Sequence, residues 1–163
     1  MARIDFVTGN VQQYLPQVEA LAGIPDLAEA ALSGRSSANF NAAASDDEWS
    51  PARVLQHMTY YALEDAHNLH RMVWQEDPLI TMWDEDQVIR EHGLGRMNGT
   101  NALDALTDAI SSSVDILKEL QDAWWGRPVV HPRSGRLSIR QFVERRVNHH
   151  NDHIAQLQAI ASD

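Results

Sequence analysis

Residues 143–160 read VERRVNHHNDHIAQLQAI, and their apolar positions recur with the period of an α-helix. Within this stretch, His149 and His153 lie four residues apart. Four residues make about one helical turn, so both imidazoles project from the same side, roughly 6 Å apart along the axis. Two neutral imidazoles at that spacing can hold one divalent transition metal ion if a third ligand comes from elsewhere. The stretch therefore predicts a long helix that carries part of a metal site.

His57 is the candidate third ligand. It lies in WSPARVLQHMTYYALED, residues 49–65, a second strongly helical segment. Successive residues of a helix are rotated by about 100°, and this rotation gives the segment a polar stripe beside its apolar one. The polar stripe contains His57, Tyr61, Glu64 and Asn68. On the last helix, His153 lies at one edge of the apolar face and His149 about 40° further out. The candidate ligands therefore flank the core, which predicts a metal ion in a crevice between two helices that water can reach.

His150 has a different position, near the centre of the apolar face of the last helix. Its spacing to His153 would also permit a ligand role. A histidine at such a position is more often a neutral, hydrogen-bonded core residue, and periodicity by itself does not decide between His149 and His150. The other histidines share no spacing with this pair and are expected on the surface or in loops: His67, His70, His92 and His131.

Length and composition limit the function classes. A chain of 163 residues and 18.3 kDa suits one domain, residues 1–163, with a sizeable core. The net charge of -10 argues against a nucleic-acid partner, and no apolar run approaches the roughly 20 residues of a membrane span. The N-terminus lacks the apolar core of a secretory signal, so we expect a cytoplasmic protein. The absence of cysteine excludes disulfides, thiolate zinc sites and a cysteine nucleophile.

The hydrophobic pattern predicts four helices and no convincing strand. The helices are expected at residues 4–32, 51–75, 100–124 and 138–161, with a flexible connection at 33–48. Pro16, Gly23 and Pro25 should kink or break the first helix.

Two of the predicted helices have clear start signals. Ser50 fits the N-cap of the second helix, and Pro51 fits its first position. The fourth helix should open with a capping box formed by Ser138 and Gln141.

The connection between the second and third helices is about 20 residues long, from 77 to 99. That length is enough to cross a bundle and would let the two helices run parallel. With Trp83 and the acidic residues 84–86, the connection could cover a pocket as a lid, or it could be a solvated loop with one buried tryptophan. The pattern as a whole predicts an all-α four-helix bundle.

Two motifs resemble those of the DinB-like superfamily, a group of small metal-binding bundles. The group includes damage-inducible proteins, bacillithiol S-transferases and relatives of the mycothiol-dependent maleylpyruvate isomerase. Its members typically show W-[ST]-x-x-x-x-[VIL]-x-H at the start of the second helix. Their last helix carries H-x-x-x-H, an apolar residue and often Gln-Leu. The first motif is matched by Trp49, Ser50, Leu55 and His57, and the second by His149, His153, Gln156 and Leu157.

The resemblance implies a bundle in which the helices run up-down-down-up, often as a homodimer. It also implies a divalent metal ion held by His57, His149 and His153, with water in the remaining positions. Three imidazoles fit zinc or nickel, and the sequence does not choose between them. Tyr61 and Glu64, one and two turns from His57, are candidates for catalytic proton transfer. The alternative is that they are solvated or lie in the seam between helices.

Three functional interpretations follow from the resemblance. The first is a metal-dependent hydrolase, or a transferase that uses a low-molecular-weight thiol, acting on a small-molecule substrate. Because the chain has no cysteine, such a thiol would come from a cosubstrate. The second is a non-catalytic stress-related or ligand-binding module with a residual metal site. The third is a metal-free bundle with incidental histidines. Tryptophans near helix ends and crossovers favour self-association of the chain.

Overall fold

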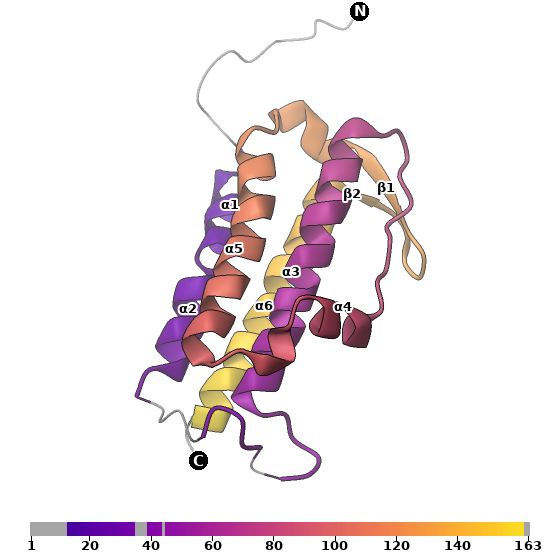
Figure 1. The fold of residues 1–163 in the computed structure, drawn as a ribbon. Helices are drawn as coiled ribbons and strands as arrows, with labels where there is room; N and C mark the ends of the chain where they lie inside the picture. Colours follow the sequence, from indigo (N-terminus) through magenta and orange to yellow (C-terminus); the bar gives the residue numbers. More distant parts are fainter. Residues whose placement is uncertain (1–12, 35–38, 44, 162–163) are drawn as a thin grey trace, which may run out of the picture.

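In the computed structural model, which describes residues 13–34, 39–43 and 45–161, four helical arms lie side by side (Figure 1). The elements in chain order are α1 (Leu15–Ala22), α2 (Ile24–Leu32), α3 (Pro51–Trp74), α4 (Glu85–Glu91), η1 (Leu94–Arg96), α5 (Gly99–Lys118), η2 (Asp122–Gly126), β1 (Pro128–His131), β2 (Gly135–Ser138) and α6 (Ile139–Ala161). The first arm is made of α1 and α2, and the other three are α3, α5 and α6. No helix in these described ranges is both long and apolar enough to cross a membrane.

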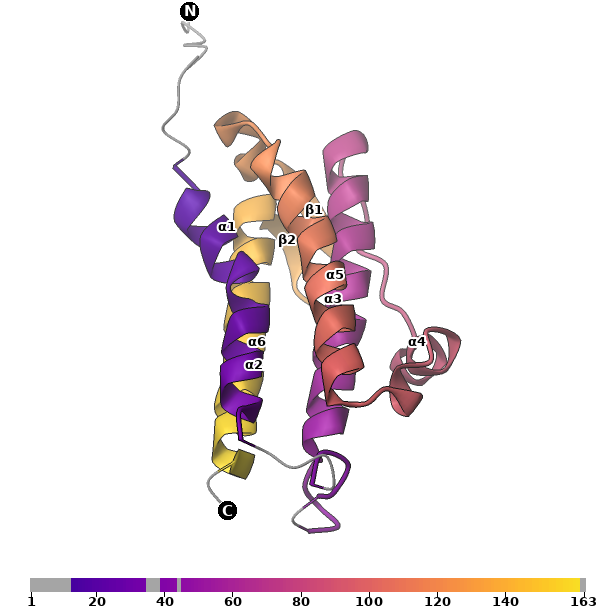
Figure 2. The same ribbon diagram turned by 60° about the vertical axis from the view of Figure 1, so that its left-hand side comes forward.

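The arms follow the order up-down-down-up, as expected. The first arm and α6 run in one direction, and α3 and α5 run parallel to each other in the opposite direction (Figures 1 and 2). The chain reaches the start of α5 by the crossover, which we define as residues 77–98 and which passes outside α3 and carries α4. The long connection between α3 and α5 therefore allows two consecutive long helices to be parallel neighbours.

The first arm breaks where the sequence predicts. Gly23 separates α1 from α2, and Pro16 and Pro25 each lie in the first turn of a helix, where the missing N–H costs no hydrogen bond. The part of the predicted helix at residues 4–12 lies outside the described residues. The break lets both short helices turn apolar side chains, such as Leu21 and Ile24, into the same core.

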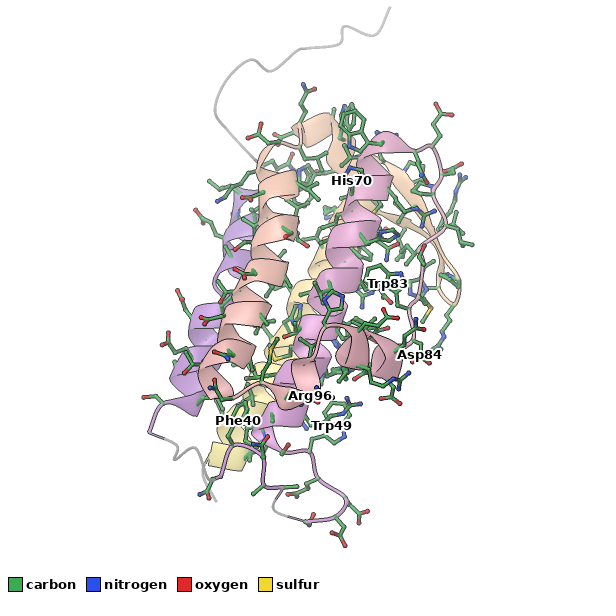
Figure 3. The ribbon with its side chains drawn as sticks, in the orientation of Figure 1. Phe40, Trp49, His70, Trp83, Asp84 and Arg96 are labelled. Atoms are coloured by element: carbon green, nitrogen blue, oxygen red, sulfur yellow. The ribbon has the colours of Figure 1, made fainter. Side chains whose placement is uncertain are left out.

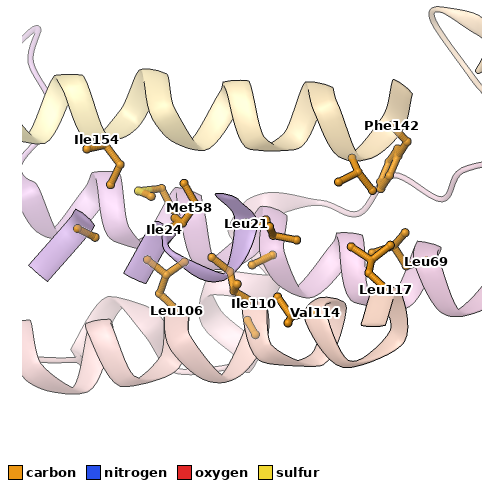
Figure 4. Packing of buried hydrophobic residues seen from close by; sticks show 14 of the residues in the cluster. Leu21, Ile24, Met58, Leu69, Leu106, Ile110, Val114, Leu117, Phe142 and Ile154 are labelled. Atoms are coloured by element: carbon orange, nitrogen blue, oxygen red, sulfur yellow. The ribbon is translucent and has the colours of Figure 1, made fainter. Parts of the chain in front are cut away.

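The core runs along the axis of the bundle and receives side chains from every arm (Figure 4). Met58 and Leu69 of α3 face Leu106 and Ile110 of α5, and all four are almost completely buried. Ser113 is the polar position in the apolar stripe of α5, and it is buried in the same way. At about 25 cal/mol per Å² of apolar surface removed from water, burial of these side chains is the main contribution that holds the helices together.

Three expectations about the connections need correction. The helix predicted to end near Trp124 ends at Lys118, and residues 122–126 form a turn of 3₁₀-helix. This turn buries Trp125, whose ring stacks on Tyr14 at 4.7 Å between centroids, and leaves Trp124 partly exposed. Burial of one large aromatic ring against the first arm thus takes precedence over continuing the helix.

The second correction is a β-hairpin that the sequence pattern did not reveal. Strands β1 and β2 are antiparallel, with Val129 paired with Leu137 and both side chains buried. Gly135 has a φ of +73° in the turn, a conformation that glycine adopts without strain. Four-residue strands are too short to show the alternation by which strands are recognised.

The third correction concerns residues 33–48, which were expected to form a flexible polar connection. Among the residues of this segment that the structure describes, Phe40 is buried in the core, and its carbonyl accepts a hydrogen bond from the N–H of Ala52. The segment is therefore attached to the start of α3 at this point.

Candidate metal centre

Three histidines come together between α3 and α6. His57 projects from α3, and His149 and His153 project from successive turns of α6. Each ring offers one nitrogen atom, and these three atoms lie within 4.8 Å of one another. The ring centroids are 5.3 Å apart for His57 and His149, 4.7 Å for His57 and His153, and 4.6 Å for His149 and His153. The residues that the sequence singled out as ligands thus form one cluster.

The two helices that carry the cluster begin at strong capping signals. Ser50 accepts a hydrogen bond from the N–H of Arg53 at 3.2 Å, with Pro51 at the first helical position. At the start of α6, Ser138 Oγ accepts from the N–H of Gln141 at 3.2 Å, and Gln141 Oε1 accepts from the N–H of Ser138 at 2.9 Å. This reciprocal capping box fixes where α6 begins, and so the phase with which its histidines face α3.

Two of the rings are held through their Nδ1 atoms. Nδ1 of His57 lies 3.0 Å from Oε1 of Glu85, and Nδ1 of His153 lies 2.8 Å from Oε1 of Gln156. With a proton on Nδ1 in each case, Nε2 is left as a lone-pair donor. For His149, Nε2 is buried and has no hydrogen-bond partner among the described residues. Each ring therefore has one nitrogen that is free to bind a metal ion.

Burial keeps two of the three histidines neutral. Burial and, to a smaller extent, the nearby His153 and His57 lower the pKa of His149 to about 4. Burial also lowers the pKa of His57, against the opposing effect of the Glu85 carboxylate. A neutral imidazole is the form that binds metal ions, so His57 and His149 are in their ligand form at neutral pH. The side chain of His57 keeps 12 % of its surface exposed, which leaves the cluster in contact with solvent.

Aromatic rings from α3 and the preceding segment surround the histidines. Trp49 lies parallel to His153 at 6.1 Å between centroids and edge-on to His57 at 5.0 Å. Tyr61 lies 4.4 Å from His149 and 4.9 Å from His57. Arg146 also contacts the Tyr61 ring, with its guanidinium carbon 4.8 Å from the centroid. Tyr61, a sequence-predicted catalytic candidate, is therefore in direct contact with two of the three histidines.

Glu64, the other catalytic candidate, is buried with only 1 % of its surface exposed. Its Oε2 accepts a hydrogen bond from the hydroxyl of Tyr60 at 2.9 Å and another from the N–H of Trp83 at 2.6 Å. Arg146 lies 3.8 Å from its Oε1. Burial and the Glu64 carboxylate raise the pKa of Tyr60, which therefore remains a hydrogen-bond donor. Glu64 is thus connected to the crossover and to Arg146.

His150 faces the interior of the bundle and not the cluster. It is 1 % exposed, and burial lowers its pKa to about 3, so it is neutral. Its Nδ1 has no hydrogen-bond partner in the described part of the chain. With Ser113 and the ion pair of Asp65 and Arg146, it lines a small cavity inside the bundle. The expectation of a neutral core histidine is confirmed, but Nδ1 lacks the hydrogen bond expected of it.

Sequence reasoning did not assign a role to Glu85 or to Arg146. Glu85 lies in an acidic run of the crossover, and nothing in the sequence indicates which of its carboxylates meets His57. Arg146 lies one turn before His149, close to the apolar face of its helix. A positive charge at such a position is a signal for a buried carboxylate partner, which here is Asp65, with Arg146 Nε 2.8 Å from Asp65 Oδ1.

Comparisons with known proteins give a family and a fold. Residues 20–157 match the sequence model of the DinB superfamily. No curated protein sequence matches the chain. Among solved structures, the chain is similar to YfiT from Bacillus subtilis, described as "a probable metal-dependent hydrolase with an unusual four-helix bundle topology". The TM-score is 0.80 with 16% sequence identity, over 96% of this chain and 90% of YfiT, a likeness that shows a shared fold.

Proposed function

The chain belongs to the DinB superfamily, and from this premise we propose that His57, His149 and His153 hold one divalent transition metal ion in a catalytic centre for a small-molecule substrate. The observation that carries the proposal is the state of the ring nitrogens. Two rings are oriented by acceptors on Nδ1, and the third has a buried nitrogen without a partner among the described residues. A buried polar atom without a partner is costly, and a metal ion would remove that cost.

Three imidazoles leave coordination positions for an exchangeable ligand, which is typical of catalytic sites. Zinc and nickel both suit imidazole ligands, and we propose one of these two ions. When bound, such an ion supplies Lewis acidity, which polarises a carbonyl group and lowers the pKa of water. The partial exposure of His57 supports access of substrate from solvent.

Among the surrounding residues, we propose Tyr61 as the group that contacts the substrate and exchanges a proton with it. Its ring touches His57 and His149, and Arg146 holds it in that position. Glu64 would act less directly, because its carboxylate is engaged with Tyr60 and Trp83. On this proposal, Glu64→Gln lowers turnover and spares metal content, because Gln keeps an acceptor oxygen for the N–H of Trp83. Tyr61→Phe lowers turnover without disturbing the fold.

We propose hydrolysis as the reaction, on the support of the description given for YfiT. Thiol transfer and a non-catalytic ligand-binding role are the alternative outcomes. The experiment compares metal-depleted protein with protein reconstituted with zinc or nickel, on a panel of esters and amides. A parallel panel offers electrophiles together with low-molecular-weight thiols. The expected result is hydrolysis that requires metal and is lost in His57→Ala. Turnover that appears only with added thiol would replace hydrolysis by transfer, and turnover in neither panel would favour the binding module.

We also infer that the protein forms a homodimer and acts in the cytoplasm. The first inference rests on the aromatic surface, since Trp74 leaves 74% of its surface exposed at the end of α3. Aromatic residues are enriched where proteins associate. The second rests on composition alone, because a chain without cysteine forms no disulfide of the kind common in exported proteins.

A further inference from the structure

The crossover is attached to α3 by a row of polar side chains, which we call the polar ladder: Tyr60, Glu64, Asn68 and Arg71. These residues are three or four positions apart, so they lie along one face of the helix. Each of them forms a hydrogen bond with a backbone group of residues 79–83. The side chains of the polar ladder therefore bind the backbone of the crossover at successive positions, as the backbone of a neighbouring β-strand would.

The bonds of the ladder are specific for backbone positions. Asn68 pairs with both backbone groups of Thr81, with its Nδ2 donating to the carbonyl at 2.8 Å and its Oδ1 accepting from the N–H at 2.8 Å. Glu64 accepts from the N–H of Trp83 at 2.6 Å, and the hydroxyl of Tyr60 lies 2.9 Å from the Trp83 carbonyl. Arg71 donates to the Leu79 carbonyl at 2.8 Å.

Burial makes these bonds strong determinants of the crossover's path. Glu64 and Asn68 are each 1% exposed with the crossover in place, so their hydrogen bonds to it are shielded from competition by water. Figure 3 shows Trp83 and Asp84 beside α3, where the crossover turns into α4. The ladder thus fixes the chain immediately before α4.

The next residues place a carboxylate against the metal centre. Asp84 caps α4 by accepting from the N–H of Gln87 at 2.7 Å. Glu85 then directs Oε1 to Nδ1 of His57 at 3.0 Å, and the same oxygen lies 3.0 Å from Arg53. Arg53 lies one turn before His57 on α3, so it holds the carboxylate from the same helix. Glu85 is two residues beyond the last bond of the ladder.

We propose that Glu85 is a positioning residue for His57, and that the polar ladder, by holding the crossover in place, sets the affinity of the three-histidine cluster for its metal ion. This inference rests on the proposed function. A carboxylate on Nδ1 keeps the proton there, turns Nε2 toward the ion and makes that nitrogen more basic. Arg53 holds the carboxylate in place through their ion pair. The crossover is then part of the metal site and not a connection alone.

The experiment measures zinc affinity of the full chain by competition with a chromophoric chelator, at one pH and one ionic strength. The variants are Glu85→Ala and Glu85→Gln, with Asp86→Asn as the matched control. Asp86 is the next residue of α4, its side chain is exposed, and it lies 4.0 Å from Arg53, against 3.0 Å for Glu85. Asp86→Asn removes the same charge as Glu85→Gln without altering a contact to His57. Glu85→Ala should weaken zinc binding by about 10- to 100-fold, the usual effect of losing an orienting partner.

Glu85→Gln keeps an acceptor oxygen and should therefore lose less affinity than Glu85→Ala. The control should stay within about 2-fold of the unaltered protein, because an exposed charge is screened by solvent and salt. A second readout is the ¹⁵N NMR signal of His57 in metal-free protein. In the unaltered chain the proton should reside on Nδ1, and in Glu85→Ala the ring should become a mixture of tautomers. A purely structural role of Glu85 would not produce that change.

The ladder is tested by Asn68→Ala, a residue for which no contact to the histidines or to Glu85 is found in the described structure. It should weaken zinc binding several-fold and shift the His57 signal in the same direction as Glu85→Ala. Circular dichroism and thermal unfolding of the metal-free variant confirm that the helices are intact. If Asn68→Ala does not fold, Arg71→Ala takes its place, since it removes the ladder bond to the Leu79 carbonyl. Unchanged zinc affinity in the folded ladder variant would overturn the role of the ladder.

Equal zinc affinity in Glu85→Ala, Asp86→Asn and the unaltered protein, with an unchanged His57 tautomer, would overturn the inference. In that outcome the unaltered protein still binds zinc and His149→Ala still loses it, so the proposed function stands. If the unaltered protein binds no zinc, or His149→Ala binds it equally well, the proposed function fails and the inference fails with it.

Discussion

At the scale of single residues, the adjacent histidines of α6 have opposite surroundings. The ring of His149 meets His57 and His153, whereas His150 is enclosed in the interior beside Ser113. His149→Ala should therefore lower zinc affinity sharply, by well over about 10-fold, since a ligand is lost. His150→Leu, of similar volume, should leave the affinity nearly unchanged. Chelator competition on both variants checks this, and a larger loss in His150→Leu than in His149→Ala would reverse the assignment.

The same histidines give the metal-free protein a pH-dependent stability. Burial lowers the pKa of His149 to about 4 and that of His150 to about 3 in the folded chain, against an ordinary value of 6.5. Between about pH 6.5 and 4, the unfolded chain therefore takes up protons that the folded chain refuses, and the free energy of unfolding falls as the pH falls. Urea denaturation at several pH values should show this fall, and His150→Leu should reduce its slope.

Asp65 affects the pH dependence of the free energy of unfolding in the opposite direction. Burial raises its pKa from 3.8 to about 7, although Arg146 opposes the rise. Between those values the folded chain retains a proton that the unfolded chain has released, so this group favours folding as the pH falls. The pKa shifts of the two histidines together exceed the shift of the one carboxyl group, so the free energy of unfolding should fall as the pH falls. Stability that rises from pH 6.5 to 4 would show that Asp65 dominates instead.

At this scale the sequence predicts the three histidines of the site but not all of their partners. Some of these contacts depend on the path of the chain in space. Helical spacing brings His149 and His153 to one side of α6, and the family motif selects His57 from eight histidines. The hydrogen-bond partners of the Nδ1 atoms of His57 and His153 differ in how far they lie along the sequence. Gln156 is three residues from His153, so local geometry makes its contact. Glu85 is 28 residues from His57, and only the path of the crossover brings it there.

At the scale of elements, the helix that carries two of the candidate ligands depends on its capping box. Ser138→Ala removes the hydroxyl that accepts from the N–H of Gln141. The expected loss is about 1 kcal/mol in the free energy of unfolding, the usual contribution of an N-cap side chain. Urea denaturation measures it, with Ser134→Ala in the adjacent turn as the control. Equal stability of the two variants would mean that the capping box does not stabilise α6.

Element starts were easier to predict than element ends. Ser50, Pro51 and Ser138 are local signals that bind backbone groups within one turn, so the sequence alone reveals them. The end of α5 depends on the burial of Trp125 against Tyr14, a contact between residues more than 100 positions apart. The hairpin likewise depends on Val129 and Leu137 finding the core. Tertiary contacts determine the end of α5 and the position of the hairpin, and the hydrophobic periodicity of the sequence does not reveal such contacts.

At the scale of the whole molecule, the proposed homodimer rests on the exposed tryptophan at the end of α3, Trp74. Light scattering at high micromolar concentration should return twice the 18.3 kDa mass of one chain. Trp74→Ser should shift the population toward the monomer, because a large apolar contact is lost. The matched control is Trp124→Ser, which removes a less exposed ring packed under Arg127. A mass near that of one chain for the unaltered protein would remove the homodimer.

The parallel arrangement of α3 and α5 followed from the length of the connection, since a short turn could have joined only antiparallel neighbours. The length did not reveal what the connection does. In the structure the crossover forms hydrogen bonds with the polar side chains of α3 and places Glu85 beside His57. Polar residues on a helix face are equally consistent with solvent, so only the fold shows that this face has a partner.

Metal content tests the central claim most directly, namely that the three histidines form a metal centre. Protein purified without an affinity tag is incubated with zinc or nickel, dialysed and measured by mass spectrometry of the elements, beside a His57→Ala/His153→Ala double variant. The unaltered chain should retain about one ion, and the double variant, left with one of the three candidate ligands, should retain almost none. Retention should also weaken as the pH falls below about 6.5, toward the lowered pKa values of His57 and His149, because protons then compete for the imidazoles. Equal metal retention by the two proteins would contradict the assignment of the site.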